Sequence, residues 1–233
     1  MRQRQMNGQA RAQACPVWAP HVLRARTGAF SLLVSQRGVA VGAKDMPELE
    51  SFAMELTAQS MASGESAPAQ QLVPIDPLHQ VLAASEAGSL IPALTPLLEP
   101  FRLPAGPTHG DLHRDNFLKV GDQFRIIDCD RFRVRGCPLF DRLHFRLSEA
   151  QRDTGRSWLD TLLARQDIVD EIACRNVTSE ALLLAYAMQR IAHEGEGAFL
   201  LKRSLRKYRD QAERLLAFSG RVRTVAHRNG EQE

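Results

Sequence analysis

Residues 108–128, THGDLHRDNFLKVGDQFRIID, decide how the chain is expected to fold. Two β-rich runs, NFLKV and QFRIID, flank a two-residue loop at 121–122 whose leading glycine favours a type II′ turn. A loop of this length fixes the pairing register, so that Asn116 faces Ile127. Asp128 is the next residue along the second strand. The sequence therefore predicts a tight hairpin with Asn116 and Asp128 at its open end.

The polar residues around that open end have the chemistry of a phosphoryl-transfer site. The amide oxygen of Asn116 and the carboxylate of Asp128 are ligands that suit Mg²⁺, which completes its shell with phosphate oxygens and water. Asp111, in the loop that enters the hairpin, can orient a hydroxyl group and accept its proton. His109 and the backbone of Gly110 are expected to shape this loop. We therefore expect a base and two metal ligands around one transferred phosphate.

Composition and charge set limits on the class of protein. The chain has 233 residues, of which 44% are hydrophobic and 24% charged, with a formal net charge of +3, as in soluble globular proteins. This charge is too small to indicate nucleic acid by itself, and no nucleic-acid partner is expected. No apolar run approaches the ~18 residues of a membrane span. The scattered cysteines contain no C-x-x-C pair, which favours a reduced, cytoplasmic setting.

The order of the expected elements indicates an α+β class rather than alternating β-α-β units. A small β-rich N-terminal part precedes a connector, the hairpin and a helical C-terminal part. Helices are expected near 139–151, 156–174, 179–193 and 197–217. The predicted divisions are a disordered leader (1–15), a small N-terminal lobe with its hinge (16–77), a C-terminal catalytic lobe (78–220) and a flexible tail (221–233).

Three motifs follow one another in this order: HGDLHRDNFL at 109–118, IIDCDRF at 126–132 and GCPLFDRLHF at 136–145. Together they resemble the aminoglycoside phosphotransferase and choline kinase branch of the protein-kinase-like superfamily. The resemblance implies a two-lobed protein-kinase-like fold, with a small, reduced β-rich N-terminal lobe and a mainly helical C-terminal lobe. It also implies that ATP binds between the lobes as co-substrate and that Mg²⁺ is the cofactor.

The resemblance also assigns roles to single residues. Asp111 would be the catalytic base, and Asn116 and Asp128 would be the metal ligands. Asp141, in the third motif, would be a structural acid that braces the catalytic loop. Four further residues within the motifs are expected to shape the loops, namely His109, Gly110, His113 and Asp130.

The chain departs from the family pattern at two places. Arg114 and Asp115 stand where many relatives have Pro-Gly, and Cys137 stands where they often have Asp. Neither change removes the expected base or a metal ligand. The ending Leu143-His144-Phe145 is similar to relatives associated with bacterial cell-surface polysaccharide biosynthesis.

The segment before the hairpin is expected to form two strands and a helix. FSLLVS (30–35) and VAVGAK (39–44) are predicted to pair around the intervening QRG. Asp45 with Glu48 three residues later matches a capping box, which predicts a helix start. The apolar positions that follow recur at helical spacing and predict one buried face, formed by Leu49, Phe52, Ala53 and Leu56.

This segment also holds the predicted nucleotide-binding residues. By the resemblance, Lys44 would bind the phosphates of ATP and pair with Glu55 of the following helix. The other interpretation is that Lys44 is a solvated residue at a strand end. Gly28, in RARTGAFS, would allow the backbone of a loop to approach the phosphates closely. The region is shorter than in most relatives, which leaves open a catalytically silent kinase-like protein.

Two other metal chemistries fit the sequence less well. A zinc set would use His109, His113, Cys129 and Cys137, but Gly110 and the hairpin disfavour the helix that the histidine spacing needs. GDLH is also found in metallophosphoesterases, whose further metal-binding blocks this chain lacks.

The last predicted helix, FLLKRSLRKYRDQAERLLAF at 199–218, interleaves leucines with lysines and arginines. A solvated basic face over a packed apolar stripe is the main interpretation. Weak contact with an anionic membrane or an acidic partner is the alternative.

The sequence therefore predicts an ATP- and Mg²⁺-dependent phosphotransferase. Its acceptor would be a hydroxyl group of a small molecule, such as a sugar, an amino-alcohol or a cell-envelope precursor. The alternative is a catalytically silent binding or scaffold protein, with a place in cell-surface polysaccharide biosynthesis.

Overall fold

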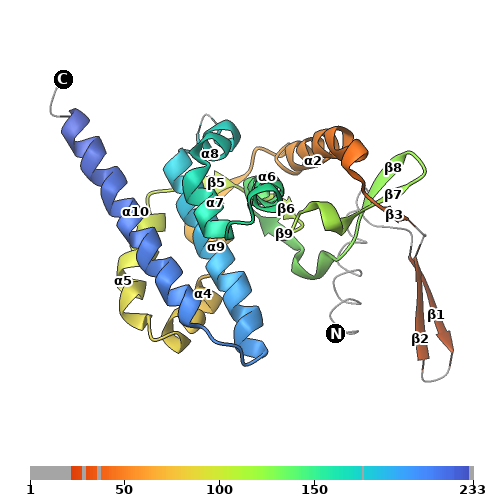
Figure 1. Cartoon of the computed structure of the whole chain (residues 1–233), viewed down its shortest axis with the longest axis horizontal. Helices are drawn as coiled ribbons and strands as arrows, with labels where there is room; N and C mark the ends of the chain where they lie inside the picture. The colour runs from red at the N-terminus through yellow and green to blue at the C-terminus, as the bar shows by residue number, and fades with distance from the viewer. Residues whose placement is uncertain (1–21, 28–29, 36–37, 175, 231–233) are drawn as a thin grey trace. The chain divides into compact units, whose positions relative to one another are not determined.

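The computed structural model describes residues 22–27, 30–35, 38–174 and 176–230 (Figure 1). These residues form small antiparallel sheets and a mostly helical C-terminal part, so the α+β class is confirmed. The predicted leader (1–15) and Gly28 lie outside the described residues. None of the helices within the described ranges is both long and apolar enough to cross a bilayer.

The chain forms two compact units, and each unit combines two separate stretches of sequence. The first contains the described residues up to Gly64 together with Gly106–Arg156, and the second contains Glu65–Ala105 together with the described residues from Ser157 onward. This division differs from the predicted lobes at 16–77 and 78–220. The reason is that the hairpin packs on the helix that precedes it in sequence, so both belong to one unit.

The first unit holds three small antiparallel sheets. Strand β1 (Val22–Thr27) pairs with β2 (Phe30–Ser35). Strand β7 (Phe117–Val120) pairs with both β3 (Val39–Ala40) and β8 (Gln123–Ile126). Strand β6 (Gly106–Thr108) pairs with β9 (Arg133–Gly136).

The pairing of the N-terminal strands differs from the prediction. Because β2 pairs with β1, the expected hairpin between 30–35 and 39–44 is wrong. The two residues of β3 pair instead with Lys119 and Leu118 of β7. A 3-10 turn, η1 (Ala43–Asp45), follows at once, so Lys44 lies in a turn rather than at the end of a strand.

The hairpin β7–β8 has the predicted register. Phe117 lies opposite Ile126 and Val120 lies opposite Gln123. Gly121 has a φ of +60°, which its lack of a Cβ permits. The N–H of Ile127 donates a 2.9 Å hydrogen bond to the carbonyl of Asn116, which confirms that these two residues face each other.

Helix α2 (Met46–Ser60) supplies the apolar face against which the hairpin packs. Phe52 meets Phe117 edge to face, with ring centroids 6.2 Å apart. A second helix, α6 (Pro138–Thr154), adds Phe145 to the same core. The buried members of this core are Leu49, Ala53, Leu56, Leu112, Phe117, Phe124, Ile126, Cys129, Phe132 and Phe145.

The start of α2 does not use the predicted capping box. Asp45 has αR backbone angles and makes no side-chain cap hydrogen bond to α2. Its carboxylate accepts a hydrogen bond from the N–H of Gly42 at 3.2 Å and another from Lys119 Nζ at 2.8 Å. Glu48 lies 3.6 Å from the same Lys119. Lys119 of β7 therefore pairs with the two acids that were expected to form the capping box of α2.

The second unit is built mainly of helices. Two of its helices, α9 and α10, contact each other, and α10 diverges from α9 toward its C-terminal end (Figure 1). The elements are β4 (Ser66–Pro68), α3 (Ala69–Leu72), α4 (Ile75–Ala84), η2 (Gly88–Leu90), α5 (Ile91–Leu94), η3 (Thr95–Leu98), β5 (Arg102–Pro104), α7 (Trp158–Ala164), α8 (Gln166–Ile172), α9 (Ser179–Leu200) and α10 (Arg206–Gly230).

Three of the C-terminal helix boundaries differ from the prediction. The segment 156–174 forms two helices, because Arg165 adopts a non-helical conformation between them. Helix α9 was expected near 179–193 and continues to Leu200. It passes through Gly195, where a Cβ would lie 2.3 Å from Val81 of α4, so this glycine lets two helices approach closely. The predicted last helix near 197–217 is divided, because residues 197–200 belong to α9 and α10 runs from Arg206 to Gly230.

Candidate functional site

A buried carboxylate holds the loop that enters the hairpin. Asp141, on the first turn of α6, accepts hydrogen bonds from the backbone N–H groups of His109 at 2.6 Å and Gly110 at 2.8 Å. Burial raises the pKa of Asp141 to about 7, while these two N–H groups act in the opposite direction. Asp141 therefore makes the bracing contact that was predicted for it.

The loop is also fixed from its other side. Gly110 has a φ of +83°, and a Cβ there would lie 2.5 Å from the carbonyl oxygen of Arg131 in η5 (Cys129–Arg131). His109 is fully buried, and its Nε2 lies 3.0 Å from the carbonyl of Ile127. Burial lowers the pKa of His109, which favours a neutral ring that donates its Nε2–H to that carbonyl. The loop conformation is thus determined by packing on both sides.

The side chain of Asn116 has a defined orientation. Asn116 is buried at the end of the 3-10 turn η4 (Arg114–Asn116). Its Nδ2 donates a 2.8 Å hydrogen bond to the backbone carbonyl of Asp111 and lies 3.1 Å from His113 Nε2. Because both contacts use the amide nitrogen, Oδ1 is the atom of this side chain that can accept a cation.

Asp128 follows the hairpin in a strained conformation. Its φ of 59° and ψ of 54° place it in the left-handed region, and its side chain makes no cap hydrogen bond to η5. This region costs an aspartate roughly 1–2 kcal/mol, and such strain tends to occur at functional positions. Asp128 is exposed, so its carboxylate is accessible to a ligand.

The predicted base lies between two histidines. Asp111 Oδ1 is 3.1 Å from His144 Nε2, and Asp111 Oδ2 is 3.8 Å from His113 Nε2. The two rings meet edge to face, with centroids 6.0 Å apart. The role of His144 was not recognised in the sequence. The available signal was its position three residues after Asp141, which puts both side chains on one face of α6.

Arg114 and Asp115 attach the loop to α6. Arg114 Nη1 lies 3.5 Å from Glu149, and Asp115 forms a 2.6 Å contact with Arg152 Nη2. The hydrogen bond from Arg152 lowers the pKa of Asp115. Two ion pairs therefore hold this turn on α6.

The predicted nucleotide-binding pair does not form in this structure. Lys44 and Glu55 are both exposed, and Glu55 accepts a 3.1 Å hydrogen bond from Gln59. No ion pair joins Lys44 to Glu55 among the described residues. The lysine paired with acids in this region is Lys119, whose contacts are given above. Asp130, another predicted loop residue, is exposed in η5.

The donor set fits a magnesium ion better than a zinc ion. Within the described parts of the chain, no group of three or more His, Cys, Asp or Glu side chains could hold a metal. Asn116 and Asp128 offer two hard oxygen donors, which matches an ion that keeps water and phosphate oxygens as its other ligands. The four residues of the zinc alternative accordingly form no such group among the described residues.

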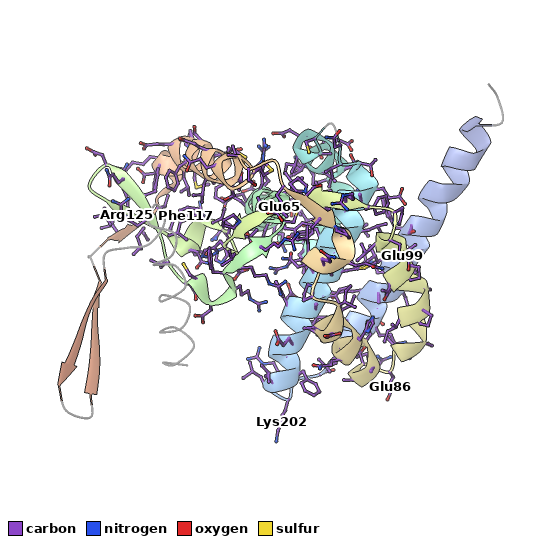
Figure 2. The ribbon with its side chains drawn as sticks, turned by 180° about the vertical axis from the view of Figure 1, so that it is seen from behind. Glu65, Glu86, Glu99, Phe117, Arg125 and Lys202 are labelled. Atoms are coloured by element: carbon purple, nitrogen blue, oxygen red, sulfur yellow. The ribbon has the colours of Figure 1, made fainter. Side chains whose placement is uncertain are left out.

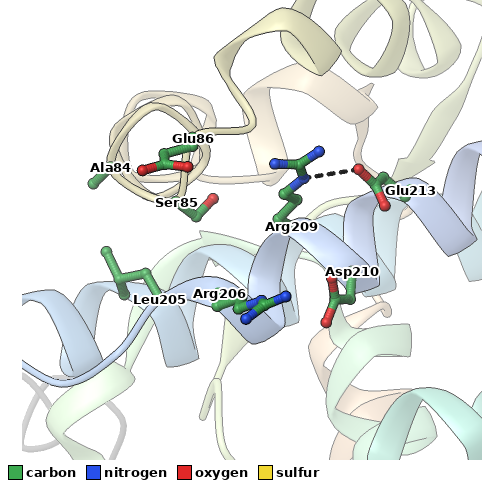
Figure 3. A pocket seen from close by; sticks show the side chains of 8 residues that line it. All are labelled: Ala84, Ser85, Glu86, Leu205, Arg206, Arg209, Asp210 and Glu213. Atoms are coloured by element: carbon green, nitrogen blue, oxygen red, sulfur yellow. Dashed lines mark hydrogen bonds and ion pairs between the residues drawn. The ribbon is translucent and has the colours of Figure 1, made fainter.

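A pocket of about 500 Å³ lies in the second unit, between the end of α4 and the start of α10 (Figure 3). Its lining includes two arginines and three acids, and Arg209 Nε donates to Glu213 at 2.9 Å. These opposite charges nearly cancel. None of the predicted site residues lines this pocket, and we assign it no chemistry.

Comparison with known proteins finds no matching family model and no matching curated protein.

Proposed function

We propose that the chain is an ATP- and Mg²⁺-dependent phosphotransferase with a protein-kinase-like fold, and that it acts on a hydroxyl group of a small molecule. The main support is the 2.8 Å hydrogen bond from Asn116 Nδ2 to the carbonyl of Asp111. It ties one expected metal ligand to the expected base, while the hairpin register brings Asp128 to the same end. A base and two oxygen ligands at one end of a hairpin are the parts that phosphoryl transfer needs.

In this proposal Asp111 is the residue that handles the proton. Its carboxylate aligns the acceptor hydroxyl and takes its proton as the hydroxyl oxygen forms a bond to the γ-phosphorus of ATP. The bond from that phosphorus to the bridging oxygen breaks in line, and ADP leaves with the electron pair. Mg²⁺ bound by Asn116 and Asp128 would neutralise charge on the phosphate oxygens.

The neighbours of Asp111 have positioning roles. His144 Nε2 lies 3.1 Å from Oδ1 of Asp111, and His113 Nε2 lies 3.8 Å from Oδ2. Asp141 holds the preceding backbone through two hydrogen bonds. Because general-base catalysis depends on distance and direction, a carboxylate held on both sides suits this role.

A turnover screen tests the proposal. The full chain is incubated with Mg·ATP and a set of hydroxylated acceptors that includes sugars, amino-alcohols and cell-envelope precursors, and ADP release is measured. Asp111→Asn should lower turnover by roughly 10²–10⁴-fold while Mg·ATP binding remains. Asp122→Asn is the control, because it makes the same change at an exposed aspartate of the hairpin turn. Equal turnover in Asp111→Asn and the wild type would refute the assigned base.

One observation favours a second candidate, a catalytically silent kinase-like binding or scaffold protein. Lys44 and Glu55, expected to bind the ATP phosphates, are exposed and form no pair with each other among the described residues. A thermal-shift titration separates the two candidates. Stabilisation by ATP that requires Mg²⁺ supports the enzyme, whereas its absence supports the scaffold.

A further inference from the structure

The end of α9 and the residue that follows it expose three consecutive large apolar side chains. Phe199, Leu200 and Leu201 have 51%, 51% and 62% of their surfaces exposed, and we call them the apolar triplet. Among the residues whose side-chain exposure the structure describes, the other exposed large apolar residues are Val39 and Val134, which stand singly. Single exposed apolar residues are ordinary on protein surfaces, whereas a contiguous group indicates an interaction site.

The residues that follow the triplet are basic. Four exposed cations and no acid lie between Leu201 and Tyr208, and we call them the basic segment: Lys202, Arg203, Arg206 and Lys207. Lys207 lies 3.5 Å from Glu194. The structure contains no ion pair of the first three with any described residue. Figure 2 shows Lys202 at this turn, with its side chain directed away from the ribbon.

The turn itself is ordered by the backbone. The N–H of Arg203 donates to the carbonyl of Ala198 at 2.9 Å, and that of Lys202 donates to the carbonyl of Phe199 at 3.0 Å. Tyr208, in the first turn of α10, is 1% exposed and anchors this end of the helix in the unit. Two packed helices therefore present the triplet and the basic segment on one rigid turn.

We propose that this turn binds the surface of an anionic lipid membrane. The apolar triplet would enter the boundary between headgroups and acyl chains, and the basic segment would contact lipid phosphates. Apolar side chains next to lysines and arginines are the combination that peripheral membrane contacts use. A second copy of the same turn would bring like charges together, so self-association through this surface is disfavoured. This proposal is independent of phosphoryl transfer.

Vesicle flotation of the full chain tests the proposal. The probes are vesicles of phosphatidylcholine alone and vesicles that also contain phosphatidylglycerol. The wild type should float with the anionic vesicles and not with the neutral ones. The variant F199S/L200S/L201S and the variant K202Q/R203Q should each lower the bound-to-free ratio by about tenfold or more, and added salt should release the wild type.

Two matched variants control for surface changes elsewhere. V39S/V134S removes the isolated exposed apolar residues, and Arg165→Gln removes an exposed arginine that pairs with Asp167. Both should float like the wild type. Circular dichroism and thermal unfolding should show that all variants fold. The proposal is overturned if the folded wild type stays unbound, if it binds both vesicle types equally, or if the triplet variant floats unchanged. Concentration-dependent self-association that the triplet variant abolishes would also overturn it, by assigning the surface to a second copy.

Discussion

His144 Nε2 lies 3.1 Å from Oδ1 of Asp111, although the two residues come from different elements. Asp111 is in the loop before the hairpin, and His144 is on α6, one turn after the acid that holds that loop. The same face of one helix thus holds the backbone of the two residues before the expected base and contacts the side chain of that base. This relationship leads to a first prediction about catalysis.

Replacing His144 by Leu should reduce kcat by roughly tenfold to a hundredfold, because the carboxylate of Asp111 loses the contact that orients it. The KM for ATP should change little. His144→Gln keeps a side-chain N–H near Oδ1 and should recover part of the loss. Steady-state kinetics over a range of pH distinguish this positioning role from a folding defect. Equal losses in the Leu and Gln variants, with the same loss of thermal stability, would contradict it.

Asp141→Asn should destabilise the fold by roughly 1–3 kcal/mol near pH 5, because an amide N–H₂ would face a backbone N–H donor. The difference should shrink at higher pH. The folded-state pKa of Asp141 is raised to about 7 from an ordinary value of 3.8, so the folded state retains this proton more strongly than the unfolded state does. The group's contribution to the free energy of unfolding therefore falls as the pH rises from about 4 to about 7.

Denaturant unfolding of the wild type and Asp141→Asn over this pH range measures that slope. The wild-type free energy of unfolding should decline relative to that of the variant between about pH 4 and pH 7, and the two should run parallel above it. Parallel curves over the whole range would show that Asp141 does not titrate in this window.

Gly110→Ala should cost about 2–4 kcal/mol of stability, because the backbone is left-handed and the new Cβ would meet the carbonyl of Arg131. Gly155→Ala is the matched control. Gly155 also has positive φ, at 67°, but a Cβ there would meet nothing within 4 Å. The control should cost only about 1 kcal/mol. Thermal unfolding compares the two, and equal costs would mean that the loop does not depend on its contact with η5.

The hairpin could be predicted from the sequence because its determinants are local. A two-residue loop with a leading glycine fixes the register, and the register fixes which residues share the open end. The contact of Asp141 with the loop was expected from a motif resemblance. In the structure this contact consists of two hydrogen bonds, donated by the backbone N–H groups of His109 and Gly110.

The features that the sequence did not predict depend on distant residues. The start of α2 lacks the predicted capping box because Lys119 of β7 binds Asp45. Helix propensity depends on the local sequence and does not include a contact with a distant strand. Helix α9 continues through Gly195, where the absence of a side chain leaves room for Val81 of α4. His144 was missed for the same reason, since its partner lies in a loop 33 positions earlier in the chain.

Calorimetric titration of the full chain with Mg·ATP tests the central claim, that Asn116 and Asp128 hold the metal beside Asp111. Asp128→Ala should weaken Mg·ATP binding by about tenfold or more, since it removes a charged ligand. Asp130→Ala is the control, because it removes an exposed carboxylate two residues away. The account predicts that Asp130→Ala binds like the wild type while Asp128→Ala does not. Equal binding by the wild type and Asp128→Ala, or no Mg²⁺-dependent binding of ATP to the wild type, would contradict it.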